Sequence, residues 1–269
     1  MSKRSQEIFA GSESELLSMT TELDELHHDV GLPAMRAGVV NMIDNMKGAV
    51  GPTSRRTFLM GAGAAVAGGA ALMTVGSALP SFAGAATRRE SSLEAAAFPP
   101  AGLTGDLAVA AVAASLENLA VFAYTAGLSA ATAGKLGAVP PAVATFATTA
   151  LSQHKQHAAA WNGVLQANHK AAVSVVNPKL APTVSADFAK VTDIAGLAEL
   201  ALTLESIAAA TYQAETSMLK SKAAIGLSAS IEPVEMQHIA ILYYVLGMYP
   251  GAQTSGGTPI AFSSTSMAV

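Results

Sequence analysis

Apolar positions recur every three or four residues over four stretches of the chain, with glycine and proline between them. This spacing is typical of helices that bury one face, and each stretch is long enough for several turns. The four predicted helices run from about 104 to 133, from after Pro141 to about 170, from about 193 to 222, and from Gly226 to Gly247.

Alanine is abundant, and no stretch alternates polar and apolar residues strongly enough to predict a sheet. Mostly short connections between long helices favour antiparallel neighbours. We therefore predict an all-α fold, an antiparallel four-helix bundle over residues 104–248. A linker at 86–103 precedes it and a flexible tail at 249–269 follows it.

Glu235 and His238 stand in an otherwise apolar run, from Ile231 to Leu246. Residues three apart share one face of a helix, so these two side chains point toward the same apolar side. A buried carboxylate or imidazole is costly to desolvate unless it has a partner. The partner is an opposite charge, a hydrogen-bond network or a metal ion.

The other three predicted helices also carry ionisable residues on apolar faces. The first and third each have a glutamate followed by a tyrosine seven residues later, and the second has two histidines three residues apart. These residues are Glu117 and Tyr124, Glu205 and Tyr212, and His154 and His157. Helices one and two thus repeat the plan of helices three and four, which indicates a weak internal duplication.

Carboxylates and imidazoles aimed at one point by four helices are the donor set of a site for one or two metal ions. The predicted metal ligands are Glu117, His154, His157, Glu205, Glu235 and His238. Tyr124 and Tyr212 are predicted to hydrogen-bond the ligands. The alternative is a metal-free polar core, in which tyrosines satisfy the glutamates, His157 packs beside Trp161 and His154 faces solvent. His169 lies outside the pattern and is predicted at the surface.

Residues 104–248 resemble the ferritin-like superfamily, in particular bacterial proteins described only as carrying a ferritin-like domain. The motif of that family is a glutamate from each of two helices and Glu-x-x-His from each of the other two. Glu117, Glu205, Glu235, His157 and His238 match it, whereas His154 replaces a glutamate. The resemblance implies iron or manganese. Because His154 replaces a carboxylate that could bridge two ions, we expect the second ion to bind more weakly. The replacement also makes zinc more plausible and disfavours redox cycling of an iron pair.

Two function classes follow from these residues. One is a metal-dependent oxidoreductase or metal-handling protein, for iron oxidation, peroxide removal or metal sequestration. The other is a metal-free bundle that serves as a structural or interaction module of the cell envelope. The net charge of −4 without a basic stripe excludes a nucleic-acid partner, and the absence of cysteine excludes disulfides and thiolate metal sites. No storage-cage surface is recognisable, so a monomer or homodimer is expected.

Residues 54–85 resemble a twin-arginine export signal. Arg55 and Arg56 precede Phe58-Leu59, an alanine- and glycine-rich apolar stretch follows, and small residues at 81–85 offer cleavage sites. A permanent transmembrane helix is the alternative, but the glycines make a weak anchor. The resemblance implies the twin-arginine translocation machinery as a partner. It also implies a periplasmic, cell-wall or extracellular location, with no stable membrane span after cleavage.

Residues 1–53 precede this signal, are predicted to be mostly flexible and receive no function. The stretch from Glu13 to Asp29 is acidic with periodic leucines, which predicts a short helix. His27 and His28 are adjacent, so on a helix they diverge. We therefore expect a solvated polar stretch there rather than a metal site.

Overall fold

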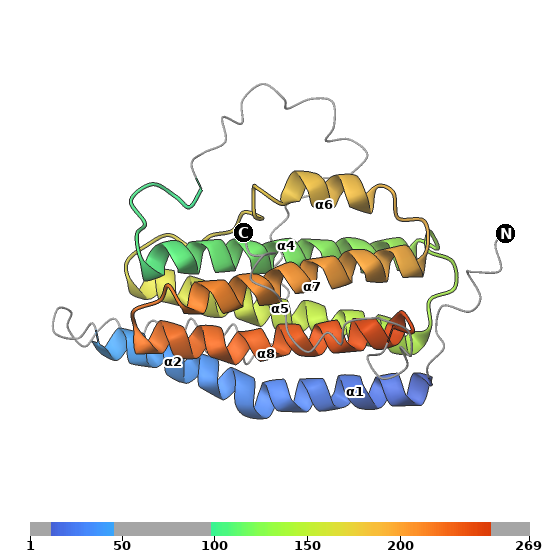
Figure 1. Ribbon diagram of the computed structural model, residues 1–269, viewed down its shortest axis with the longest axis horizontal. Helices are drawn as coiled ribbons and strands as arrows, with labels where there is room; N and C mark the ends of the chain where they lie inside the picture. Colours follow the sequence, from blue (N-terminus) through green and yellow to red (C-terminus); the bar gives the residue numbers. More distant parts are fainter. Residues whose placement is uncertain (1–11, 46–97, 249–269) are drawn as a thin grey trace, which may run out of the picture.

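The computed structural model describes residues 12–45 and 98–248, and four long helices form its centre (Figure 1). These helices are α4 (Asp106–Thr132), α5 (Pro141–Ala167), α7 (Ile194–Thr216) and α8 (Lys222–Val245). The described residues contain no strand, so the predicted all-α bundle is confirmed. The signal segment with Arg55 and Arg56, most of the linker and the tail from 249 lie outside the described residues.

Each bundle helix runs antiparallel to its neighbours. Gly127, near the end of α4, faces Leu197 near the start of α7, and a Cβ at Gly127 would come within 2.9 Å of the Leu197 side chain. Val109, near the start of α4, shares a buried cluster with Tyr212 near the end of α7. At the opposite corner, Val143 at the start of α5 clusters with residues at the end of α8.

This arrangement places the end of α5 and the start of α7 at opposite ends of the bundle. The connection between them therefore follows the long axis, and it contains the short helix α6 (Ala181–Phe188), which the sequence analysis did not predict (Figure 1). Val184 of α6 packs with Leu119 of α4 and Leu204 of α7.

Local capping sets where the bundle helices begin. Pro141 occupies the first turn of α5, where its missing N–H costs nothing. The Asp193 carboxylate accepts a hydrogen bond from the Gly196 amide at 2.9 Å, and Ser221 Oγ accepts one from the Ala224 amide at 3.3 Å. The predicted boundary between the third and fourth helices was therefore wrong. The serine cap starts α8 at Lys222, and Gly226 lies inside that helix.

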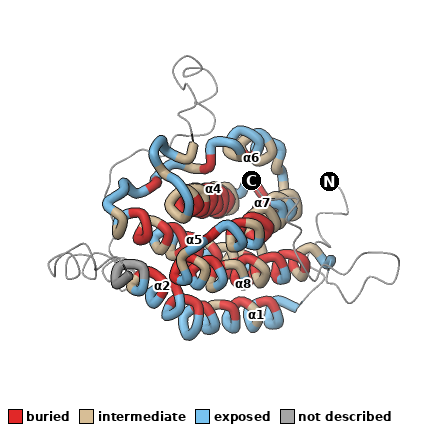
Figure 2. The backbone as a smooth tube through the Cα atoms, turned by 60° about the vertical axis from the view of Figure 1, so that its left-hand side comes forward, coloured by how far each residue is buried: buried red, intermediate tan, exposed pale blue. Residues whose placement is uncertain are grey.

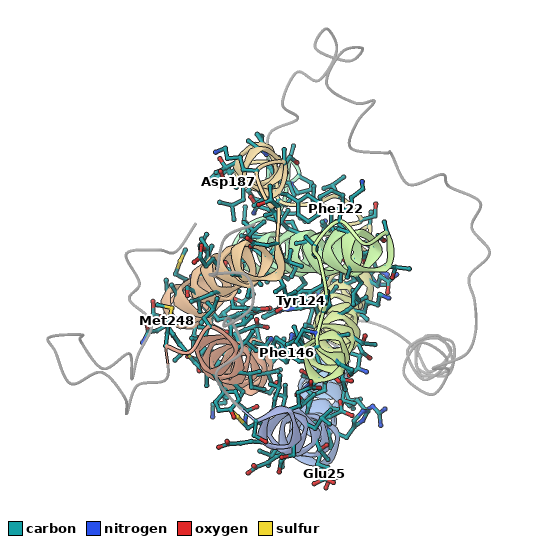
Figure 3. The ribbon with its side chains drawn as sticks, turned by 90° about the vertical axis from the view of Figure 1, so that its right-hand side faces the viewer. Glu25, Phe122, Tyr124, Phe146, Asp187 and Met248 are labelled. Atoms are coloured by element: carbon teal, nitrogen blue, oxygen red, sulfur yellow. The ribbon has the colours of Figure 1, made fainter. Side chains whose placement is uncertain are left out.

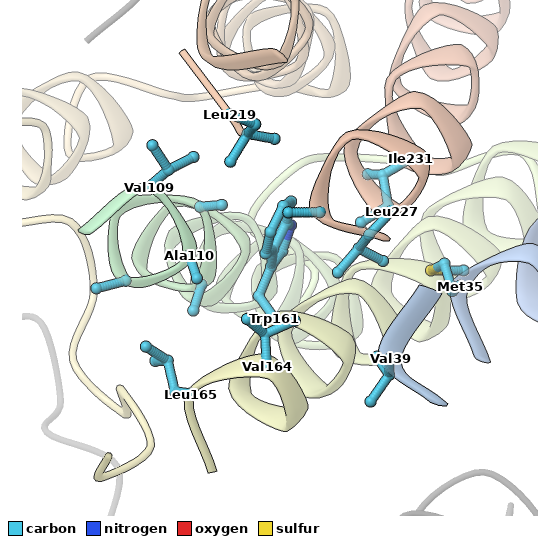
Figure 4. Close-up of a cluster of buried hydrophobic side chains, with 14 of the residues drawn as sticks. Met35, Val39, Val109, Ala110, Trp161, Val164, Leu165, Leu219, Leu227 and Ile231 are labelled. Atoms are coloured by element: carbon cyan, nitrogen blue, oxygen red, sulfur yellow. The ribbon is translucent and has the colours of Figure 1, made fainter. Parts of the chain in front are cut away.

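Residues 12–45 form a further helical layer along α5 and α8, which we call the N-terminal cover (Figure 2). It consists of α1 (Glu13–Leu26), one π-helical turn, η2 (His27–Gly31), and α2 (Leu32–Asn45). Its buried apolar side chains are Leu16, Leu23, Leu32, Met35 and Val39. Figure 4 shows Met35 and Val39 on the side of the cluster where α8 contributes Leu227 and Ile231.

The helix expected from Glu13 is therefore present, but the expectation of a mostly flexible N-terminal extension is wrong for residues 13–45. Burying large apolar side chains stabilises the folded chain by roughly 1.5–3 kcal/mol each, which fixes the cover on the bundle.

Two described helices, α4 and α7, are long and apolar enough to cross a membrane by length and composition alone. Each carries one fully buried glutamate and packs within the bundle, which also explains its apolar character.

Candidate metal centre

All six predicted ligand side chains point into the interior of the bundle, and each is at most 2% exposed. Figure 3 looks along the bundle axis and shows Tyr124 and Phe146 between the helices. The helices contribute one or two residues each: Glu117 from α4, His154 and His157 from α5, Glu205 from α7, and Glu235 and His238 from α8. The i, i+3 pairs on α5 and α8 each deliver two side chains to one place.

The six side chains make two overlapping groups of potential metal ligands. The first group is Glu117, His154, His157 and Glu235, and the second is His154, Glu205, Glu235 and His238. Within each group the ligand atoms lie within 4.8 Å of one another. Residues more than a hundred positions apart in sequence thus converge, with His154 and Glu235 common to both groups. That they bind metal remains a prediction.

His154 lies between two carboxylates and is fully buried, so the alternative in which it faces solvent is wrong. Its Nδ1 is 2.9 Å from Glu117 Oε2, and its Nε2 is 3.1 Å from Glu205 Oε1. Burial alone lowers the pKa of His154, but attraction to Glu205 and Glu235 outweighs it and raises the pKa well above its usual value. Without metal, a protonated His154 donates to the carboxylates of Glu117 and Glu205.

Glu235 and His157 are the polar residues of the centre that lack hydrogen bonds. Both carboxylate oxygens of Glu235 and both ring nitrogens of His157 are buried without a hydrogen-bond partner among the described residues. Glu235 Oε1 lies 3.0 Å from His157 Nδ1, but the two groups are not aligned for a hydrogen bond. Leaving four such atoms unsatisfied is expensive, and a divalent cation satisfies carboxylate oxygen and imidazole nitrogen together. The donor set therefore fits a metal ion.

Tyr124 and Tyr212 hold the other two carboxylates, an arrangement that both the metal site and the metal-free polar core predicted. Tyr124 Oη donates to Glu205 Oε1 at 2.5 Å, and Tyr212 Oη donates to Glu117 Oε1. Trp161 Nε1 donates in turn to Tyr212 Oη at 2.9 Å. Tyr212 thus leaves Glu117 Oε2 facing His154, whereas Glu205 Oε1 contacts both Tyr124 and His154, and Glu205 Oε2 faces His238.

His238 is oriented by Gln153, a buried residue that the sequence analysis did not identify. His238 Nε2 lies 2.8 Å from Gln153 Oε1. On the other side of the ring, His238 Nδ1 faces Glu205 Oε2 at 3.4 Å and Glu235 Oε2 at 3.7 Å. An imidazole that gives one N–H to an acceptor keeps its other nitrogen free for an ion.

His27 of the N-terminal cover adjoins the centre, which corrects the expectation of a solvated stretch. Its ring is 1% exposed and lies 5.2 Å, centroid to centroid, from the ring of His157. Its Nε2 is 2.7 Å from Gln156 Oε1. His28 and His169 are exposed, as expected. The intervals of seven and four residues between Leu16, Leu23 and His27 are the sequence signal that would have placed His27 on the buried face.

The pKa shifts of His27 and His157 change the stability of the metal-free protein in opposite directions, one below and one above pH 6.5. Burial and repulsion from His157 lower the pKa of His27 from 6.5 to about 3. Stability from a neutral His27 is therefore present above pH 6.5 and lost as pH falls toward 3. Burial also opposes charge on His157, but attraction to Glu117 and Glu235 outweighs it and raises the pKa to about 9. That contribution is present below pH 6.5 and lost as pH rises toward 9.

Urea unfolding of the metal-free chain at several pH values measures this prediction. Between pH 6 and 5, protonation of His27 should lower the free energy of unfolding by up to about 1.4 kcal/mol per pH unit, whereas Glu215, whose pKa burial raises from 4.5 to about 8, acts in the opposite direction. The measured quantity is therefore the difference between two chains: relative to a His27→Gln variant, the wild-type chain should lose up to about 1.4 kcal/mol per pH unit as pH falls from 6 to 5. Parallel pH profiles of the two chains would contradict this prediction.

Comparison with known proteins agrees with this geometry. A family model for the ferritin-like domain matches residues 105–248, just over half of the 269 residues. No curated protein matches the chain, and no solved structure does. The matched range holds the four bundle helices and all six converging side chains. The chain belongs to the ferritin-like domain family.

Proposed function

We propose that this chain is an exported metal-binding protein whose bundle holds a divalent metal ion for metal oxidation, peroxide removal or metal handling. The observation that carries the proposal is the set of four buried atoms without a hydrogen bond on Glu235 and His157, two residues that lie within 3.0 Å of each other. They lie in a group with Glu117 and His154 whose ligand atoms are within 4.8 Å of one another. A core shaped by stability alone favours partners for all such atoms.

His154 limits how many ions are held tightly. Its Nδ1 faces the first group and its Nε2 the second, but a neutral imidazole has a single lone pair to give. Three carboxylates also fall short of the charge of two divalent ions. We therefore infer one tightly bound ion for each chain, with any second ion bound more weakly.

The protein residues fix the donors before an ion arrives. Tyr124 and Tyr212 hold the carboxylates of Glu205 and Glu117, and Gln153 holds the Nε2 edge of the His238 ring. The side chains of the centre are at most 2% exposed, so bulk water is kept from the ligands. A bound iron or manganese ion supplies one-electron redox chemistry, whereas zinc supplies Lewis acidity alone.

Export is the second part of the proposal, and it is supported by the arginine pair and apolar stretch at 54–85. The twin-arginine route carries folded proteins, which suits a buried site that is filled in the cytoplasm before export. An ion trapped by folding is also chosen in the cytoplasm rather than outside.

Metal analysis of the purified full chain tests the proposal. We expect close to one equivalent of iron, manganese or zinc, and a melting temperature that falls when a chelator removes it. At an ion concentration a hundred times Kd, binding adds about 2.7 kcal/mol to the free energy of unfolding.

A chain without bound metal, with a melting temperature that neither chelator nor added iron, manganese or zinc changes, would refute metal binding. It would favour the metal-free bundle that serves as a structural or interaction module of the envelope.

A further inference from the structure

The N-terminal cover contacts the metal centre through hydrogen bonds as well as through apolar packing. Asp24 of α1 faces Gln153 of α5, and Gln153 Nε2 donates to Asp24 Oδ1 at 3.3 Å. The other end of the same amide group lies 2.8 Å from His238 Nε2. One buried glutamine therefore joins the cover to a predicted metal ligand.

The chemistry of Asp24, Gln153 and His238 fixes which group donates and which accepts in the two hydrogen bonds that connect them. A carboxylate oxygen accepts and does not donate, so the NH₂ group of Gln153 must face Asp24. Its carbonyl oxygen then faces His238, and His238 Nε2 must carry a proton to donate. The lone pair available on His238 is consequently the one on Nδ1, on the side of Glu205 and Glu235.

The apolar packing of the cover holds Asp24 in register with Gln153. Leu23, beside Asp24, is 2% exposed, and it belongs to a cluster with Phe146 of α5 and Ile241 of α8. Phe146 in turn lies 6.0 Å from the ring of His238, centroid to centroid. One turn further along the chain, His27 packs against His157. The cover thus contacts the predicted ligand His157 directly and is connected to His238 through Gln153 and Phe146.

We propose that Asp24 is a positioning residue of the metal centre. It holds the Gln153 amide in the orientation that accepts from His238 Nε2 and leaves His238 Nδ1 facing the ion. The residues before the export motif are then part of the functional protein. This inference rests on the proposed metal-binding function.

The test compares three variants of the full chain: Asp24→Ala, Asp24→Asn and Asp29→Ala. Asp24→Ala removes the acceptor, so the Gln153 amide is free to turn over. Asp24→Asn removes the charge but keeps a carbonyl oxygen that still accepts. Asp29→Ala is the matched control, because Asp29 is an exposed acid on the same cover with no contact to the centre. Asp24 is itself part-exposed, so all three variants are expected to fold.

The first measurement needs no metal: the exchange rate of the His238 Nε2 proton with water, followed by NMR in the metal-free chain. The second is the dissociation constant for Zn²⁺, followed at the His238 signals with a competing chelator. We expect Asp24→Ala to speed proton exchange and to weaken Zn²⁺ binding about tenfold, the lower end for outer partners of metal ligands. Asp24→Asn and Asp29→Ala should match the wild-type chain in both measurements.

Equal exchange rates and equal affinities for Asp24→Ala and Asp29→Ala would overturn the inference. A wild-type chain that binds no Zn²⁺, iron or manganese would instead overturn the proposed function. In that case the exchange rate alone still decides whether Asp24 holds the imidazole of His238.

Discussion

Replacing Glu235 by glutamine is expected to weaken metal binding by more than about a hundredfold, beyond the usual effect of losing an outer partner. Glu235 is one of two residues common to both groups of ligand atoms, so no ion position escapes the change. Its two oxygens have no hydrogen-bond partner among the described residues, which leaves both for the ion. An amide has the same shape but no charge and a single accepting oxygen.

Isothermal titration with Zn²⁺ and Mn²⁺ measures the change, and Glu199→Gln is the matched control. Glu199 is exposed on α7, outside both groups, so its replacement removes the same charge without touching the centre. The two variants should have closely similar circular dichroism spectra, since the substitution preserves side-chain volume. Unaltered affinity in Glu235→Gln would mean that the ion, if bound, lies elsewhere.

The bundle and its convergent side chains were predictable because local spacing carries most of the information. Residues three apart lie on one face of a helix, so the spacing of Glu235 and His238 within an apolar stretch places both polar side chains on the buried face. When four helices each carry one or two ionisable residues on an apolar face, a bundle is the structure that lets these polar groups satisfy one another. The sequence therefore predicted which six side chains meet, even though some of them are far apart along the chain.

The contacts that were missed depend on long-range packing rather than on spacing. Gln153 was not identified, because nothing in the local sequence shows that its amide joins Asp24 to His238. The adjacent His28 led to the prediction of a solvated stretch, although the position of His27 four residues after the apolar Leu23 was the better guide to its burial. The π-helical turn at 27–31 also shifts the register of the buried face by a fraction of a turn.

The N-terminal cover affects what cleavage of the predicted export signal would do to the protein. Residues 54–85 lie between the cover and the bundle in the sequence, so cleavage near 83–85 would cut the covalent link between them. The buried side chains of the cover, including Leu16, Leu23 and Met35, would then hold it only by packing. An exported protein that keeps Asp24 at its metal centre must either retain the signal uncut or carry the cover as a separate, tightly packed peptide.

Replacing His154 by glutamate is expected to raise the number of tightly bound ions from one to two in each chain. The substitution completes the second Glu-x-x-His pair of the family motif. A carboxylate has two oxygens and can bridge two ions, whereas the neutral imidazole of His154 binds one. The change also brings the carboxylates of the centre to four, which balance the charge of two divalent ions.

The same substitution should destabilise the metal-free protein. His154 now sits between Glu117 and Glu205 at hydrogen-bonding distance, and its pKa is raised well above the usual value by the surrounding carboxylates. Removing that positive charge leaves four buried acids facing one another, which must take up protons or open the bundle. The melting temperature without metal should therefore fall, and added Mn²⁺ or Fe²⁺ should restore it.

Native mass spectrometry of the loaded chain counts the ions directly, and His169→Glu is the control, because His169 is exposed just beyond the end of α5. The control should keep one ion, and added Mn²⁺ or Fe²⁺ should raise its melting temperature no more than that of the wild-type chain. If His154→Glu still binds a single ion at saturating metal, charge and bridging at position 154 do not set the stoichiometry. The distance between the two ligand groups would then limit the number of bound ions. In that case His154 replaces the glutamate of the family motif for its role in the fold rather than for its role as a metal ligand.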